Sequence, residues 1–146
     1  SGLYGVLRPL DLMQPYRLEM GTRLSTSKGK NLYEYWGSTI ADYLNARQQD
    51  ENPPVIVNLA SEEYFKSVDK AVLKARVVQC VFQDWTRDTW KVVSFHAKRA
   101  RGLMTRYAIQ NKAATPEALQ AFASEGYMYD ASVSSADKLV FRRKQA

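Results

Sequence analysis

The sequence predicts an α+β fold in which a central mixed, partly antiparallel sheet is flanked by helices. Short β-branched runs, such as residues 55–59 and 77–82, are typical of buried strands. Apolar residues three and four positions apart, as in residues 31–49, are typical of helices. Because these strands and helices do not alternate regularly, a doubly wound βαβ fold is not expected.

In the first half, residues 7–20 contain two prolines and predict turns and short extended pieces. Residues 31–49 predict one helix, which ends before Pro53 and Pro54. Residues 55–59 then predict a strand. Ser61 precedes two glutamates and predicts the N-cap of short helical pieces within residues 62–74.

In the second half, residues 77–82 and 90–95 predict paired strands around a polar stretch. Residues 97–112 predict a helix rich in strong helix formers. Thr115 and Pro116 predict the N-cap and first position of another helix. Residues 127–131 and 139–143 flank a serine-rich loop and predict a final hairpin.

The composition indicates a folded chain of 146 residues, with 45% apolar and 12% aromatic residues. We expect residues 1–146 to form a single domain, or the C-terminal portion of a larger domain whose N-terminal part is missing. No apolar run approaches the length that spans a bilayer, so no membrane partner is expected. The single Cys80 cannot form an internal disulfide, which predicts a cytoplasmic location. The oligomeric state is not predicted.

The net charge of +6 comes from one part of the chain. Residues 66–106 contain ten basic and three acidic side chains, whereas the rest of the chain contains eleven basic and twelve acidic ones. Residues 91–106 have five cations and no carboxylate. Such a local excess of positive charge indicates a polyanionic partner.

Four of these cations lie in the predicted helix: Lys98, Arg99, Arg101 and Arg106. Helical spacing places Lys98, Arg101 and Arg106 on one side, with Arg99 off that side. A row of this kind suits a phosphate backbone. The alternative is a solvated helix face without a partner.

A second candidate for phosphate binding is the turn Gly2-Leu3-Tyr4-Gly5, followed by Arg8 and, further on, Arg17. Glycines permit positive φ and close approach of the backbone to another molecule. Backbone N–H groups of such a turn can face a phosphate. The alternative is the glycine turn that commonly ends a helix.

A third candidate is a ligand pocket formed by Asn58, Ser61, Glu63 and Tyr64, which follow a predicted strand and begin a helix. Ligands often bind at this position in open α/β sheets. The alternative is a strand-to-helix turn whose polar groups are satisfied by its own side chains. The aromatic residues Tyr4, Tyr16, Tyr64, Trp85 and Trp90 are candidates for stacking on unpaired bases. The alternative for most of them is a place in the core or at its rim. His96 and Cys80 are too few for a zinc site, so no metal is predicted. Because the sequence has no nucleophile elbow, P-loop or dinucleotide fingerprint, no cofactor or catalytic residue is predicted either.

The chain resembles the bacterial YaaA family of peroxide stress proteins along nearly its whole length. The resemblance is carried by segments in a specific order: residues 2–11 (GLYGVLRPLD), 15–20 (PYRLEM), 57–61 (VNLAS), 63–66 (EYFK), 97–102 (AKRARG) and 124–127 (SEGY). It implies a role in limiting free iron under peroxide stress, and DNA binding through a helix-hairpin-helix-like element and a basic cleft.

Three functions are therefore considered. The first is binding of double-stranded or bubble-containing DNA without sequence specificity, with no enzymatic activity. The second is part of an enzyme that acts on a nucleobase, nucleotide or modified nucleic acid, which requires a deep pocket with convergent polar groups. The third is an RNA or protein interaction module in which the aromatic side chains form an exposed patch.

Overall fold

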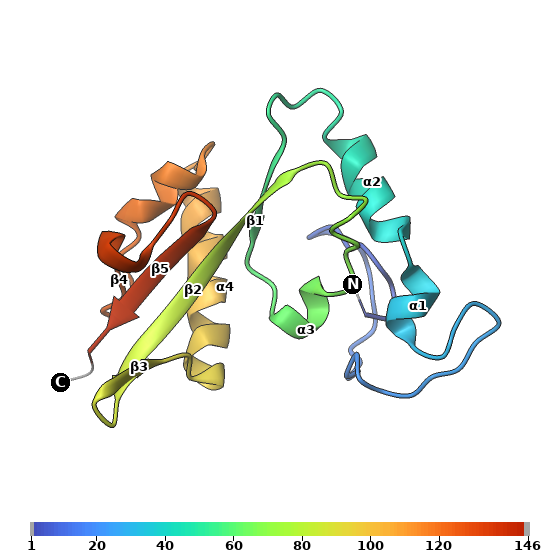
Figure 1. Cartoon of the computed structure of the whole chain (residues 1–146), viewed down its shortest axis with the longest axis horizontal. Helices are drawn as coiled ribbons and strands as arrows, with labels where there is room; N and C mark the ends of the chain where they lie inside the picture. The colour runs from blue at the N-terminus through green and yellow to red at the C-terminus, as the bar shows by residue number, and fades with distance from the viewer. Residues whose placement is uncertain (1, 145–146) are drawn as a thin grey trace. The chain divides into compact units, whose positions relative to one another are not determined.

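The computed structural model describes residues 2–144, and the chain divides into two compact units (Figure 1). The first unit contains the residues up to Pro54 together with Ala60–Ala75. The second contains Val55–Leu59 and the residues from Arg76 onward. The sheet belongs to the second unit, to which residues 55–59 contribute an edge strand.

The sheet of the second unit is mixed, as expected. Strand β2 (Arg76–Thr86) pairs in parallel with β1 (Val55–Asn58) and with β5 (Lys138–Arg143). The short strands β3 (Thr89–Lys91) and β4 (Met128–Tyr129) add antiparallel pairs to β2 and β5, respectively. The α+β prediction and the predicted final hairpin are therefore confirmed.

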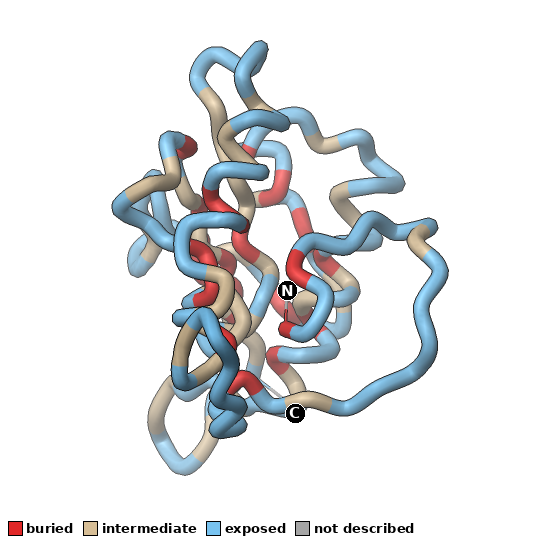
Figure 2. The backbone as a smooth tube through the Cα atoms, turned by 90° about the vertical axis from the view of Figure 1, so that its right-hand side faces the viewer, coloured by how far each residue is buried: buried red, intermediate tan, exposed pale blue. Residues whose placement is uncertain are grey.

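Helix α4 (Ser94–Gln110) packs on one face of this sheet. In Figure 1 it lies behind β2 and β5. Alternate residues of β2 point toward the core, so Val78, Cys80 and Phe82 are buried while their neighbours are half-buried. The core also contains three residues of α4 and a group of aromatic rings: Ala97, Ala100, Met104, Phe122, Tyr127 and Phe141. In Figure 2 the buried residues of the chain are coloured red.

Two 3₁₀ helices complete the second unit: η1 (Pro116–Ala121) and η2 (Ala131–Val133). Pro116 begins η1 as predicted, but the Thr115 side chain makes no capping hydrogen bond. The strand expected over residues 90–95 ends at Lys91, because residues 94 and 95 already belong to α4.

The first unit contains α1 (Leu32–Trp36), α2 (Thr39–Arg47) and α3 (Glu62–Phe65). The single helix expected over residues 31–49 is two helices, because Gly37 adopts a positive φ of 48° and ends α1. Ser61 caps α3 as predicted, accepting a hydrogen bond from the backbone N–H of Tyr64. Ile40, Ala41 and Val68 form the small core of this unit.

Candidate nucleic-acid interface

Helix α4 has four cations and no carboxylate over its seventeen residues. Its buried residues face the sheet, which leaves Lys98 and Arg106 exposed on the outer surface. Neither forms an ion pair with any residue between positions 2 and 144. Both charges are therefore available to an external anion.

The other two cations of α4 are in different surroundings. Arg99 forms a two-pronged ion pair with Glu125, whose oxygens accept from its Nε at 2.7 and 2.9 Å. This contact holds the pKa of Glu125 below its usual value. Arg101 is only partly exposed, and burial lowers its pKa. The charge of Arg99 is thus compensated within the fold. The guanidinium of Arg101 is less accessible to solvent than the charged groups of Lys98 and Arg106.

The turn from Gly2 to Gly5 has the backbone conformation that its glycines suggest. Gly2 and Gly5 have positive φ values of 60° and 66°. A Cβ at Gly5 would lie 2.8 Å from the indole of Trp36, and the Trp36 Nε1–H donates to the Gly2 carbonyl at 2.7 Å. Packing against Trp36 is therefore one reason for glycine here. The helix-hairpin-helix assignment remains a prediction.

Both arginines near this turn have acidic neighbours. Arg8 donates from its backbone N–H and from Nε to the carboxylate of Asp11, each at 2.8 Å. This contact lowers the pKa of Asp11. Arg17 lies 3.4 Å from Glu19, and both side chains of that pair are largely exposed. These two cations are therefore partly compensated, in contrast to Lys98 and Arg106.

The four residues of the predicted ligand pocket make hydrogen bonds within the fold. Asn58 Nδ2 donates to Gln79 at 2.6 Å, and Ser61 caps α3. Glu63 accepts from the backbone N–H of Met20 at 2.8 Å, and the Tyr64 hydroxyl donates to a backbone carbonyl, that of Leu18. Their polar groups thus connect segments of the chain to each other.

A buried charged cluster lies at the carboxyl ends of β2 and β5. Asp84 is 1% exposed and accepts from Arg143 Nε at 2.8 Å and from the Tyr127 hydroxyl at 2.7 Å. His96 Nδ1 lies 3.4 Å from the same carboxylate. Burial raises the pKa of Asp84, but the bonds from Tyr127 and Arg143 outweigh it, so the pKa lies below its usual value. The carboxylate is held ionised as part of the core.

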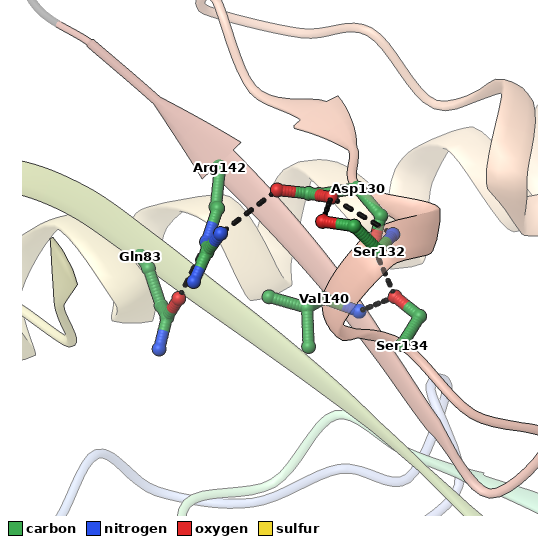
Figure 3. Close-up of polar contacts among 6 residues, drawn as sticks. All are labelled: Gln83, Asp130, Ser132, Ser134, Val140 and Arg142. Atoms are coloured by element: carbon green, nitrogen blue, oxygen red, sulfur yellow. Dashed lines mark hydrogen bonds and ion pairs between the residues drawn. The ribbon is translucent and has the colours of Figure 1, made fainter.

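The neighbouring Arg142 takes part in a second polar network, on the opposite face of β5 (Figure 3). Its Nε donates to Gln83 at 2.9 Å, and its Nη1 donates to Asp130 at 2.9 Å. Asp130 also accepts from Ser132, while Ser134 accepts from the backbone N–H of Val140. This network fixes the guanidinium of Arg142 at the end of the sheet.

Sequence reasoning did not single out Asp84, Arg143 or Arg142. The available signal was the pair Arg142-Arg143 at the end of a predicted strand, where alternation must place one of them on the core face. An arginine on a core face requires a buried acid.

Cys80 is 3% exposed, and burial raises the pKa of its thiol to about 12, so almost no reactive thiolate is present near neutral pH. Within residues 2–144, no group of three histidine, cysteine or acidic residues has the arrangement of a metal site. No helix in the same range is long and apolar enough to cross a membrane.

Comparison with known proteins gives close relatives. A UPF0246 protein of Bordetella petrii is 79% identical over 144 residues, which are 99% of this chain and 56% of that protein. A UPF0246 protein of Bordetella pertussis is 79% identical over 146 residues, covering 100% and 57%. Another, from Polaromonas naphthalenivorans, is 68% identical over 145 residues, covering 99% and 56%.

The chain thus spans little more than half the length of these relatives. The family model described as peroxide stress protein YaaA matches residues 1–133, a range that includes the glycine turn, α4 and the segment around Tyr127. The order of these segments and the extent of the match show that the chain belongs to the YaaA family of peroxide stress proteins.

Proposed function

We propose that the chain binds DNA without sequence specificity, in the cytoplasm, as part of the response to peroxide stress. One observation carries the proposal: Lys98 and Arg106 are exposed on a helix without carboxylates and have no ion-pair partner among the described residues. Contacts between cations and phosphates supply affinity and position the protein, but carry no sequence information. The link to free iron stays a prediction from the family.

The other cations take lesser roles in this proposal. Arg101 is partly buried, and Arg99 must leave Glu125 before it can contact a phosphate. The Gly2–Gly5 turn, Arg8 and Arg17 are a second proposed contact, in which a phosphate would compete with Asp11 and Glu19. We therefore expect the largest effects on binding from Lys98 and Arg106.

Substitution of both residues tests this assignment. In the variant Lys98→Gln/Arg106→Gln, affinity for duplex DNA at low salt is expected to fall about tenfold, because two phosphate contacts are lost. The slope of log K against log salt should become shallower by about 2, or about 0.9 for each contact. Fluorescence anisotropy titrations at several salt concentrations measure both quantities.

The matched control is Arg23→Gln/Arg47→Gln, which removes the same charge from exposed positions of the first unit. If the affinity for DNA falls by the same factor in both double variants, and both show the same slope of log K against log salt, net charge alone explains the effect. The assignment of the DNA contact to Lys98 and Arg106 of α4 would then be wrong.

A further inference from the structure

We propose that Trp85 and Trp90 form a stacking site for unpaired bases of a DNA strand, with Lys144 as the cation available to a phosphate. The inference rests on the proposed DNA binding and adds to it a preferred form of DNA. The residues are separate from the cations of α4.

The two indoles lie opposite each other across the β2–β3 hairpin. Trp85 and Trp90 are register partners, and their ring centroids are 5.1 Å apart with an interplanar angle of 67°. Along β2, Trp85 follows the buried Asp84 and therefore points to the face of the sheet opposite the core. Trp85 is 37% exposed, so part of a large apolar ring is accessible to solvent.

A cation accompanies each indole. The guanidinium of Arg142 lies 4.8 Å from the centre of the Trp90 ring, and the Lys144 ammonium lies 4.9 Å from the centre of the Trp85 ring. Arg142 is held in place by Gln83 and Asp130, as Figure 3 shows, whereas Lys144 is exposed. Arg142 is therefore compensated by Asp130 and packs on the Trp90 ring, whereas Lys144 is the exposed cation beside the two aromatic rings.

This combination suits single-stranded rather than paired DNA. Proteins that bind single strands stack bases on aromatic side chains and neutralise the adjacent phosphates with cations. In a duplex, the faces of the bases are already covered by their neighbours in the stack, and only the phosphates are accessible. A base that stacks on Trp85 would displace the Lys144 ammonium, which could then pair with a phosphate of the same strand.

The cross-strand tryptophan pair also stabilises its hairpin, so a test must separate stability from binding. We would compare a duplex containing a central bubble of unpaired thymines with the fully paired duplex, using anisotropy. Trp85→Ala is expected to weaken binding to the bubble about tenfold or more, with duplex affinity unchanged within about twofold. Trp85→Phe retains an aromatic face and should restore most of the bubble affinity.

Intrinsic fluorescence provides a second measurement, whose main readout is made on the unmodified chain. Oligo(dT) should quench tryptophan emission of the unmodified chain, and the quenching should be lost in Trp85→Phe/Trp90→Phe, which retains only Trp36. Unchanged bubble affinity in Trp85→Ala, or no quenching by oligo(dT), would overturn the inference while duplex binding stands. Absence of binding to both DNA forms by the unmodified chain would instead end the proposed function.

Discussion

Phe82→Ala is expected to lower the free energy of unfolding of the second unit by about 3–5 kcal/mol. Phe82 is 1% exposed, and its ring lies among three other aromatic rings at centroid distances of 5.3 to 6.0 Å, those of Phe122, Tyr127 and Phe141. Removing the ring leaves a cavity between the sheet and the elements that cover it, and the rigid neighbouring rings cannot fill it. Urea denaturation followed by circular dichroism measures the loss.

The matched control is Phe95→Ala, the same substitution at a side chain that is 77% exposed. Its free energy of unfolding should stay within about 0.5 kcal/mol of that of the unmodified chain. Equal losses in the two variants would show that Phe82 does not lie at the centre of the core.

Asp84→Asn is expected to cost about 3–5 kcal/mol, because it removes one partner of a buried ion pair. Arg143 would keep its charge while its side chain is only 10% exposed, and the Tyr127 hydroxyl would lose its charged acceptor. The control is Asp137→Asn, which breaks the exposed pair with Arg76 and should cost much less. If both variants lost similar amounts of stability, burial would not be the reason why the pair of Asp84 and Arg143 stabilises the fold.

The same carboxylate predicts a dependence on pH. The pKa of Asp84 is lower in the folded chain than in the unfolded chain, so its contribution to stability is complete above the unfolded value of about 3.9. As the pH falls through the folded pKa, that contribution is lost. Asp84→Asn should therefore lose less stability than the unmodified chain when the pH is lowered below about 4, as measured by denaturation at each pH.

Local patterns predicted the type and place of many elements. The structure agrees with three local predictions: the strand over residues 55–59, the N-cap at Ser61 and the final hairpin, in which residues 128–129 pair with 141–142. Each depends on neighbours in sequence or on strand alternation, which the sequence displays directly. The helix expected over residues 31–49 was wrong because Gly37 has a left-handed conformation, whereas glycine inside a helical pattern is often tolerated.

Contacts between distant residues were beyond prediction. Strand β2 continues through Asp84 to Thr86, although a charged residue is unusual in a buried strand. It is tolerated because Arg143 lies 59 residues further along the chain and is brought beside it by the parallel pairing of β2 with β5. Likewise, nothing in the basic segment indicates that Arg99 is paired with Glu125, 26 residues away. A cation count from sequence therefore overestimates the positive charge available to an external anion.

The central claim, DNA binding through phosphate contacts, is tested most directly by the salt dependence of binding to two duplexes of unrelated sequence. Anisotropy titrations between about 50 and 200 mM salt should give log K values that fall linearly with log salt. Both duplexes should show the same slope and similar affinities, because phosphates carry no sequence information. No binding at the lowest salt concentration, an affinity that does not change with salt, or a strong preference for one sequence would contradict the account.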